Sequence, residues 1–254
     1  MMYFLTACLI FQNAASYLDE WLRFHTLVGV EHFYLYDNDS DDDFRFVIRP
    51  FQAEGRVTLH KWPGTAQQEN AFRHCLNQYR GSAQWIAFLD DDEFLFPAIG
   101  ENVPEILRDY DSYAGVAVCW LLFGSNGHLT RPPGLVTHNY RRRADWVDPH
   151  VKCVVNPNKV TEPAVLGHSF RCRPGEQIVD ENHRPVSGPF VEVPSANVLC
   201  VNHYLIKSHE ELIQRRARRR ADGGTSHSIE EWKRFDSSYD QREDLRIQRF
   251  AVSL

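Results

Sequence analysis

The chain has 254 residues, of which 43% are hydrophobic and 24% are charged, and its formal net charge is -6. These proportions are ordinary for a soluble globular protein and exclude a disordered chain. The acidic balance argues against general nucleic-acid binding, because that affinity comes mainly from neutralising phosphates with Lys and Arg.

The cysteines and the N-terminus indicate the compartment. Six cysteines are scattered without a CxxC pair, which predicts buried thiols in a reducing compartment and argues against a disulfide framework or a zinc site. The N-terminal apolar run is short and has no basic segment before it, so it predicts a buried strand and supports neither a signal peptide nor a membrane span. We therefore expect a cytoplasmic protein.

The first half of the chain predicts alternating strands and helices. Apolar runs at 3–11, 32–36, 56–62 and 85–89 are typical of buried strands. A helix is expected from a capping box at Ser16 and Asp19 to Val28, with Gly29 ending it, and a second helix is expected after a cap at Thr65. This alternation predicts an α/β fold with a doubly wound, Rossmann-type, mostly parallel sheet and helices on both faces.

The carboxyl ends of these strands define a candidate binding edge. They are expected to gather on one side of the sheet at Asn13, Asp37, Lys61 and Asp90. Open α/β sheets bind ligands outside the carboxyl ends of their strands, so a nucleotide could lie there. Asp37 could accept hydrogen bonds from a ribose or a base, although its position alone favours an ordinary turn aspartate.

The second half has a different pattern. After a short helix at 104–110 and a strand at 115–123, residues 124–194 are rich in glycine, proline and short β-type runs, which predicts loops and antiparallel pieces. A strand at 198–206 leads to a helix with a capping box at Ser208 and Glu211, and residues 229–254 predict one or two helices. Without an internal repeat or linker, residues 1–254 are expected to form a single domain.

The stretch WIAFLDDDEFLFP at 85–97 places four acidic residues between apolar segments. In an extended chain Asp90 and Asp92 point the same way, and two such anions repel by about 1–3 kcal/mol. The repulsion indicates a cation nearby, and a solvated acidic turn is the open alternative. Hard cations such as Mn²⁺ or Mg²⁺ are held by one or two carboxylates plus substrate phosphates, and imidazole also suits Mn²⁺. His203, on a late strand that could lie beside the fourth, is a candidate third ligand; a core histidine is the alternative.

An arginine run at 215–220 allows three interpretations. It could be a solvated helical face, a contact with anionic lipid at a membrane surface, or a partner for a pyrophosphate. The sequence contains no phosphate-binding loop, no glycine-rich dinucleotide-binding motif, no nucleophile elbow of hydrolases and no histidine pair of zinc proteases. A carboxylate site therefore remains as the candidate.

The order of segments resembles glycosyltransferase family 92 and its bacterial relatives, a group once labelled domain of unknown function 23. The resemblance rests on FQNAASYLDEWLRFHTLVGVEHFYLYDNDSDD at 11–42, QWIAFLDDDEFLFP at 84–97, WLLFGSNGH at 120–128, HVKCVV at 150–155 and NHYLIKSHEEL at 202–212. It implies a GT-A-like fold and the transfer of a sugar from a nucleotide diphosphate sugar, with a UDP-sugar as the expected donor and a glycan or other hydroxyl compound as the acceptor.

The resemblance also implies roles for particular residues. Asp90 and Asp92 correspond to the DxD metal motif, His203 completes the set around Mn²⁺ or Mg²⁺, and Lys207 falls on the diphosphate side. The donor side comprises Asn13, Asp37, Gln67, Asp90 and Asp91. Residues 1–123 are then the nucleotide-sugar half, 124–224 the acceptor and metal half, and 225–254 C-terminal helices. In one departure, Gln12-Asn13-Ala14 stands where the family usually has Lys-Asn-Glu, so a charged group expected near the donor is missing.

An enzyme that inverts the anomeric centre needs a general base for the acceptor hydroxyl. His128, Asp145 and Asp148 lie in the loop-rich segment and are the candidates. Two other functions remain open: a sugar-1-phosphate nucleotidyltransferase, and a non-catalytic protein that binds nucleotide sugars or carbohydrate.

Overall fold

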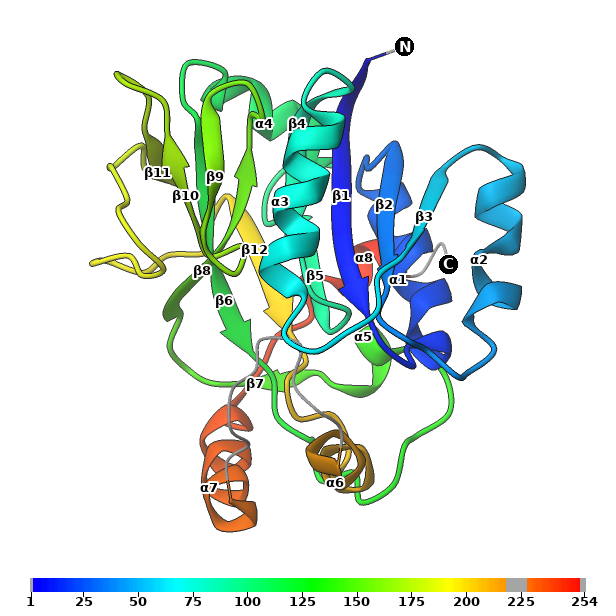
Figure 1. The fold of residues 1–254 in the computed structure, drawn as a ribbon. Helices are drawn as coiled ribbons and strands as arrows, with labels where there is room; N and C mark the ends of the chain where they lie inside the picture. The colour runs from blue at the N-terminus through cyan, green and yellow to red at the C-terminus, as the bar shows by residue number, and fades with distance from the viewer. Residues whose placement is uncertain (1, 218–227, 252–254) are drawn as a thin grey trace.

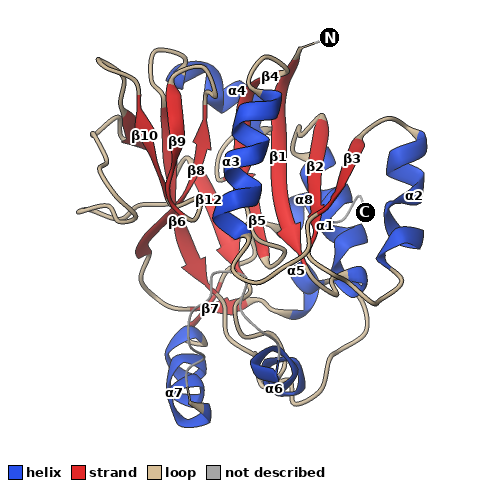
Figure 2. Cartoon of the chain, in the orientation of Figure 1, coloured by secondary structure: helices blue, strands red, loops and turns tan. Residues whose placement is uncertain are grey.

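The computed structural model describes residues 2–217 and 228–251. Its main element is a nine-stranded sheet in the order β3-β2-β1-β4-β8-β6-β12-β5, with β11 beside β6 (Figures 1 and 2). The sheet strands are β1 (Tyr3–Phe11), β2 (His32–Asp37), β3 (Val57–Lys61), β4 (Ala83–Phe88), β5 (Glu93–Pro97), β6 (Gly115–Leu122), β8 (Asp148–Val155), β11 (Ile178–Asp180) and β12 (Leu199–His203). The shorter ladders pair β7 (Arg142–Arg143) with β13 (Arg242–Glu243) and β9 (Val160–Val165) with β10 (Ser169–Cys172).

Helices cover both faces of this sheet. They are α1 (Ala15–Leu27), α2 (Phe44–Ala53), α3 (Gln68–Tyr79), α4 (Val103–Leu107), α5 (Val136–Asn139), α6 (His209–Ala217), α7 (Ile229–Tyr239) and α8 (Gln248–Ala251), with a 3-10 turn at Arg108–Tyr110. Leu5, Ala7 and Leu9 of β1 share a core with α1 and α2, whereas Cys8 and Ile10 share another with α3. Because alternate residues of a strand point to opposite faces, the unbroken apolar run of β1 is buried on both sides.

The N-terminal strands are parallel, as predicted. β1 pairs in parallel with β2 and β4, and β2 pairs in parallel with β3. Their carboxyl ends therefore lie on one edge of the sheet, which brings the segments after Phe11, Asp37, Lys61 and Phe88 to that edge.

The second half adds antiparallel strands to the same sheet. β8 lies between β4 and β6 and is antiparallel to both, and β5 is antiparallel to β12. β9 and β10 form a hairpin. The predicted α/β class, with a mostly parallel sheet and a partly antiparallel second region, is confirmed. The division into functional halves at 123 and 224 stays a prediction.

Several local predictions were wrong. Helix α2 was missed, because its sequence, FRFVIRPFQA, contains Pro50 and follows a turn-prone acidic segment. α1 begins at Ala15, after an Ala14 cap without a side-chain hydrogen bond, so no box forms at Ser16. α3 is preceded by Gln67, and Thr65 does not cap it. The second capping box is confirmed, since Ser208 Oγ accepts from the Glu211 N–H at 3.3 Å and Glu211 Oε2 accepts from the Ser208 N–H at 3.2 Å.

The predicted neighbour of His203 also needs correction. β12 does not lie beside β4 but between β6 and β5, and β5 itself was not predicted as a strand. All six cysteines are free thiols, as predicted; Cys172 is half-buried and the others are buried. Across residues 2–217 and 228–251, no helix combines the length and apolar character that crossing a membrane requires.

Candidate functional site

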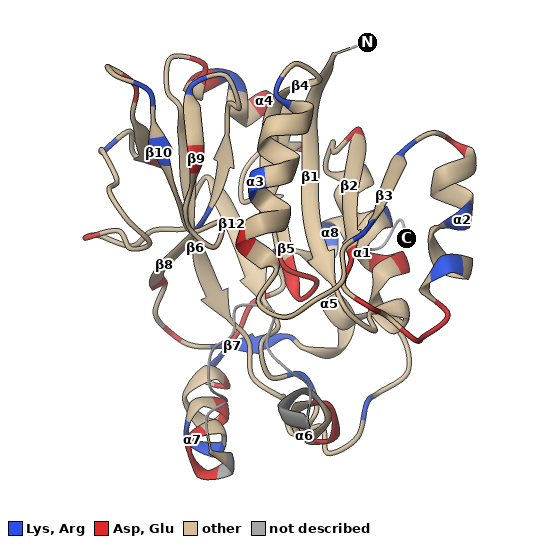
Figure 3. Cartoon of the chain, in the orientation of Figure 1, with Lys and Arg blue, Asp and Glu red and all other residues tan. Residues whose placement is uncertain are grey.

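The acidic residues after β4 form a tight turn, and the expected extended conformation of Asp90 and Asp92 was wrong. β4 ends at Phe88, residues 91 and 92 are turn residues, and β5 begins at Glu93. The Glu93 N–H donates to the Asp90 carbonyl at 3.2 Å. The indole N–H of Trp21, on α1, donates to the carbonyls of Asp90 and Glu93 at 3.2 and 2.9 Å. The turn is thus held at the carboxyl edge of the sheet, where Figure 3 shows acidic ribbon beneath β4.

Lys152 of β8 is the cation that pairs with this turn. Its Nζ atom lies 2.8 Å from Asp90 Oδ2 and 3.4 Å from Glu93 Oε2. The Nε2 amide of Gln68 donates to Asp90 Oδ1 at 2.6 Å. Lys152 is only 1% exposed. Sequence reasoning missed this residue, although a lone lysine inside the apolar strand HVKCVV is a signal that it needs a buried anionic partner.

Burial and charge set the protonation of this cluster. Burial raises the pKa of Glu93 to about 7. The ammonium of Lys152 acts to lower this pKa, and the Asp90 carboxylate acts to raise it. Burial acts to lower the pKa of Lys152, but the carboxylates of Asp90 and Glu93 more than offset it, and the pKa is raised. Lys152 is therefore charged at neutral pH and is paired with the carboxyl groups of Asp90 and Glu93.

Asp92 and His203 meet at the end of β12. The Nε2 atom of His203 lies 3.5 Å from Oδ1 of Asp92, and both side chains are buried. The Tyr204 N–H donates to the Asp92 carbonyl at 2.8 Å, and the Trp120 ring centroid lies 4.4 Å from that of His203. A carboxylate oxygen beside an imidazole nitrogen is a donor set that suits Mn²⁺.

The predicted metal set of Asp90, Asp92 and His203 is assembled in part. Asp90 is directed to Lys152 and Gln68. In the part of the chain that the structure describes, no three His, Cys, Asp or Glu side chains form a group that could hold a metal ion alone. The pair of Asp92 and His203 fits a divalent cation that takes its other ligands from a phosphate-bearing substrate.

The donor-side candidates hold the neighbouring loops together. Asn13, at a φ of 54°, accepts from the Asp41 N–H through Oδ1 at 2.8 Å. Asp37 Oδ1 accepts from the Ser40 N–H at 2.9 Å. Gln67 Nε2 donates to the Thr65 carbonyl at 3.1 Å. These contacts place the three residues on the predicted edge, and each has a structural role in a strand-to-helix loop.

Lys207 lies on the same side of the molecule as α1. Its Nζ atom is 3.9 Å from the ring centroid of Tyr17, and the guanidinium carbon of Arg131 is 4.4 Å from the same centroid. Arg131 also donates to the Ser16 carbonyl at 2.8 Å. Two cations thus flank the start of α1. Asp91, the remaining donor candidate, is half-buried within the acidic turn.

The three candidates for the general base have different surroundings. His128 is half-buried, and its Nε2 atom lies 3.3 Å from the Asn139 carbonyl. Asp145 is exposed in the segment between β7 and β8. Asp148 contacts His150: its Oδ1 atom lies 2.7 Å from His150 Nδ1. His150 was not among the predicted residues, although HVKCVV begins with it.

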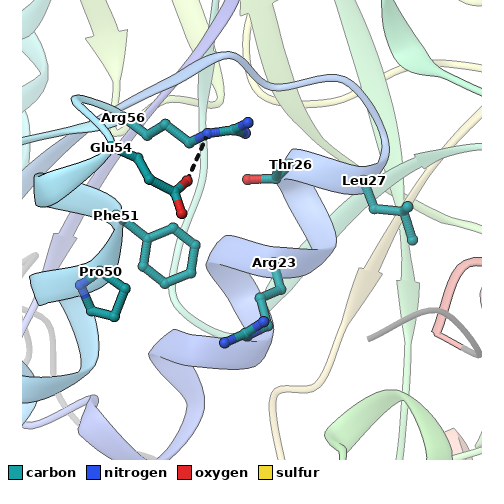
Figure 4. A pocket seen from close by; sticks show the side chains of 7 residues that line it. All are labelled: Arg23, Thr26, Leu27, Pro50, Phe51, Glu54 and Arg56. Carbon is teal, nitrogen blue, oxygen red and sulfur yellow. Dashed lines mark ion pairs between the residues drawn. The ribbon is translucent and has the colours of Figure 1, made fainter.

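Two further features lie apart from the acidic turn. The side chains of the predicted arginine run at 215–220 fall outside the described residues. A pocket of about 280 Å³ opens between α1 and α2 (Figure 4) and is lined by Arg23, Thr26, Leu27, Pro50, Phe51, Glu54 and Arg56. Leu27 ends α1 and Arg56 precedes β3, so this pocket lies toward the amino ends of the parallel strands, opposite the candidate site.

Comparisons with known proteins identify relatives of the chain. The sequence model of Glycosyltransferase family 92 matches residues 3–184. A glycosyltransferase family 92 protein of Ricinus communis is 31% identical over 216 residues, covering 80% of this chain and 35% of that protein. The galactan beta-1,4-galactosyltransferase GALS3 of Arabidopsis thaliana is 29% identical over 105 residues, covering 37% of this chain and 21% of that protein. The chain therefore spans about a third or less of the length of these relatives.

Among solved structures, S. aureus TarS 1-349 in complex with UDP is similar at a TM-score of 0.43 and 10% identity, with coverage of 78% of this chain and 60% of that chain. A likeness at this level does not bear on the assignment, which rests on the sequence matches. Because the family model spans most of the sequence, the chain belongs to glycosyltransferase family 92.

Proposed function

We propose that the protein is a metal-dependent glycosyltransferase that moves a sugar from a nucleotide diphosphate sugar, a UDP-sugar, to a hydroxyl group of a glycan or similar acceptor, with inversion of the anomeric centre. The observation that carries the proposal is the pair of Asp92 and His203 beside the acidic turn of a family 92 chain, with His203 Nε2 3.5 Å from Asp92 Oδ1. A carboxylate and an imidazole suit Mn²⁺, and such a cation takes its remaining ligands from the phosphates of a substrate.

Asp92 and His203 are the residues proposed to hold that cation, Mn²⁺ or Mg²⁺. When bound, it neutralises charge on the donor diphosphate and so stabilises the departing nucleoside diphosphate. Lys152 fixes the Asp90 carboxylate at the rim of the turn, 2.8 Å from its ammonium. Lys207, which lies beside Tyr17 at the start of α1, is proposed to pair with the diphosphate as negative charge develops on it.

Asn13, Asp37, Gln67 and Asp91 are proposed to line the nucleotide side of the site. Their support is position: Asn13, Asp37 and Gln67 belong to loops at the carboxyl edge of β1, β2 and β3, and Asp91 to the turn after β4. Galactose is the first donor sugar to test, because the relative GALS3 is a galactan beta-1,4-galactosyltransferase. His128, Asp145 and Asp148 are the acceptor-side candidates.

The direct test is to incubate the protein with Mn²⁺, a panel of radiolabelled nucleotide sugars that starts with UDP-galactose, and oligosaccharide acceptors. The proposal expects transfer of label to an acceptor, with loss of transfer when EDTA removes the metal. Binding of a nucleotide sugar without hydrolysis or transfer would overturn it in favour of a non-catalytic binding protein. Formation of a nucleotide sugar from a nucleoside triphosphate and a sugar 1-phosphate would instead indicate a nucleotidyltransferase.

A further inference from the structure

Asp148 and His150 form a carboxylate–imidazole pair on β8. Oδ1 of Asp148 lies 2.7 Å from Nδ1 of His150 and 3.0 Å from the backbone nitrogen of the same residue. The pairing of β8 with β6 shifts register here, from Cys119 opposite Val151 to Trp120 opposite Asp148. Bulges of this kind re-aim side chains and are frequent beside active sites. The His150 side chain remains 41% exposed, so a ligand can reach it.

This pair lies next to the proposed metal site, because Trp120 contacts both histidines. The Trp120 ring stacks on His150, with centroids 5.1 Å apart and planes 19° apart, and lies 4.4 Å from the ring of His203. On its other side His150 meets Phe190, at 4.3 Å between ring centroids. Phe190 is exposed, so an aromatic surface continues from His203 outward to solvent. Aromatic faces of this kind suit the apolar face of a sugar ring.

We propose that His150 is the general base that activates the acceptor hydroxyl and that Asp148 is its positioning residue. This inference rests on the proposed glycosyltransferase function and deepens it. The N–H at Nδ1 donates to Asp148, which leaves the lone pair of Nε2 to accept a proton. Asp148 thus acts through His150, as a carboxylate orients the base in other base-assisted sites.

The Nε2 lone pair of His150 takes the proton of the acceptor O–H while the acceptor oxygen forms a bond to the anomeric carbon. The bond from that carbon to the phosphate oxygen breaks, and its electron pair leaves with the nucleoside diphosphate. The positive charge gained by the imidazole is stabilised by the Asp148 carboxylate. The products are the glycosylated acceptor, the nucleoside diphosphate and one proton, which His150 later releases.

The neighbouring groups are poorer bases. His168, whose ring centroid lies 6.4 Å from that of His150, has its Nδ1 atom 2.7 Å from the Val151 carbonyl. Burial, and next the charge of Lys152, lowers the pKa of His168 to about 4, so it stays neutral and binds a proton weakly. The Nε2 atom of His128 faces the Asn139 carbonyl at 3.3 Å. Among the three sequence-based candidates, Asp148 is the one placed on this surface, but its Oδ1 is occupied by His150.

The test compares His150→Gln, His150→Gly and Asp148→Asn with wild type and with His138→Gln, a control at an exposed histidine. UDP with Mn²⁺ is the binding probe, measured by calorimetry, and the donor is the radiolabelled UDP-sugar of the panel that wild type consumes. We expect the kcat for transfer to fall by about 10²- to 10⁴-fold in His150→Gln, the usual worth of a general base. UDP affinity should stay within threefold of wild type, and added imidazole should restore transfer in His150→Gly. The kcat for transfer should fall less in Asp148→Asn than in His150→Gln. The control His138→Gln should match wild type in both kcat and UDP affinity.

Two results in the transfer assay overturn the assignment while leaving the proposed function intact, and a third result comes from the binding assay. One is transfer by His150→Gln within threefold of wild type. The other is a larger loss in Asp148→Asn than in His150→Gln without imidazole rescue, which would make Asp148 the base. A wild-type protein that binds UDP but transfers no sugar would overturn the proposed function, and this assignment with it. Loss of UDP binding together with transfer in His150→Gln would assign His150 a structural role.

Discussion

Two groups of polar residues lie at the carboxyl edge of the sheet, and their chemistry differs. At the ends of β1 and β2, Asn13 and Asp37 accept backbone hydrogen bonds from the adjoining loop at 2.8 and 2.9 Å. After β4, the acidic turn places the carboxyl groups of Asp90 and Glu93 beside Lys152 and that of Asp92 beside His203. The first group bonds to backbone N–H groups of its own loops, whereas the second is paired with a buried ammonium and an imidazole from strands distant along the chain.

The comparison separates structure from function on physical grounds. A neutral hydrogen bond contributes only about 0.5–1.5 kcal/mol, and turns use many of them. A buried charge costs far more unless it is paired, and clusters of coupled, buried ionisable groups are frequent at functional sites. Variants at Lys152, Glu93 and Trp21 change the second group, and a variant at Asp37 changes the first.

Removing the lysine should have the largest effect. Lys152→Met leaves buried carboxylates without their cation, and breaking such a pair by removing one partner typically costs about 3–5 kcal/mol. Urea denaturation should show a fall of this size in the free energy of unfolding. Lys61→Met, at an exposed lysine at the end of β3, is the matched control and should change stability by less than about 0.5 kcal/mol. Equal losses in both variants would contradict the burial argument.

The acidic turn should also give stability a distinctive pH dependence. Folded protein keeps the Glu93 proton up to a pKa of about 7, whereas the unfolded chain releases it near 4.5. Between these values the folded state binds more protons, so its stability falls as the pH rises. The free energy of unfolding of Glu93→Gln, compared with that of wild type at the same pH, should therefore rise by about 3 kcal/mol from pH 4 to pH 8. Denaturation in the presence of EDTA measures this difference. A difference that does not change with pH would show that Glu93 is ionised throughout.

The anchoring of the turn by α1 should have an intermediate effect. Trp21→Phe keeps most of the aromatic packing but removes the N–H that donates to the carbonyls of Asp90 and Glu93. The Asp90 carbonyl keeps the Glu93 N–H as a donor, so the loss falls mainly on the buried Glu93 carbonyl. Because a lost hydrogen bond to a buried group costs about 1–3 kcal/mol, we expect a stability loss in that range with weaker UDP binding in Mn²⁺. Trp146→Phe, at an exposed tryptophan, is the control. Unchanged stability in Trp21→Phe would show that the turn does not depend on the indole.

The smallest effect is expected at Asp37. Asp37→Asn preserves the Oδ1 acceptor for the Ser40 N–H, so stability should change by less than about 1 kcal/mol. If the carboxylate also contacts the nucleotide, UDP affinity should fall about 10- to 150-fold, since hydrogen bonds to charged groups are worth about 1.5–3 kcal/mol. Calorimetry and urea denaturation on the same variant separate the two roles. Unchanged UDP affinity would assign Asp37 to the loop alone.

Much of the N-terminal fold could be predicted because its signals are local. Continuous apolar runs such as 3–11 indicated doubly covered strands, and the acidic stretch after Leu89 marked the carboxyl edge of the sheet. Helix α2 was missed, since Pro50 and its charged residues obscure the helical pattern. The helix caps at Ser16 and Thr65 were predicted from residue type, but their backbones start the helices elsewhere.

The site was predictable in outline, because DDDE between apolar runs is visible in one sequence. The residues that pair with the acidic turn could not be predicted, because they come from strands distant along the chain. Lys152 reaches Asp90 only because β8 inserts between β4 and β6, and His203 reaches Asp92 only because β12 pairs with β5. The pairing of Asp148 with His150 depends on a shift in strand register that residue types alone do not reveal.

The most direct test of the account is calorimetric titration of UDP into wild type and Asp92→Asn, each with Mn²⁺ and with EDTA. The account predicts that Mn²⁺ tightens UDP binding to wild type at least 100-fold, or about 2.7 kcal/mol, and that Asp92→Asn loses this gain while its affinity in EDTA matches that of wild type. Equal Mn²⁺-dependent affinity in the two proteins would contradict the assignment of the acidic turn as the metal and donor site.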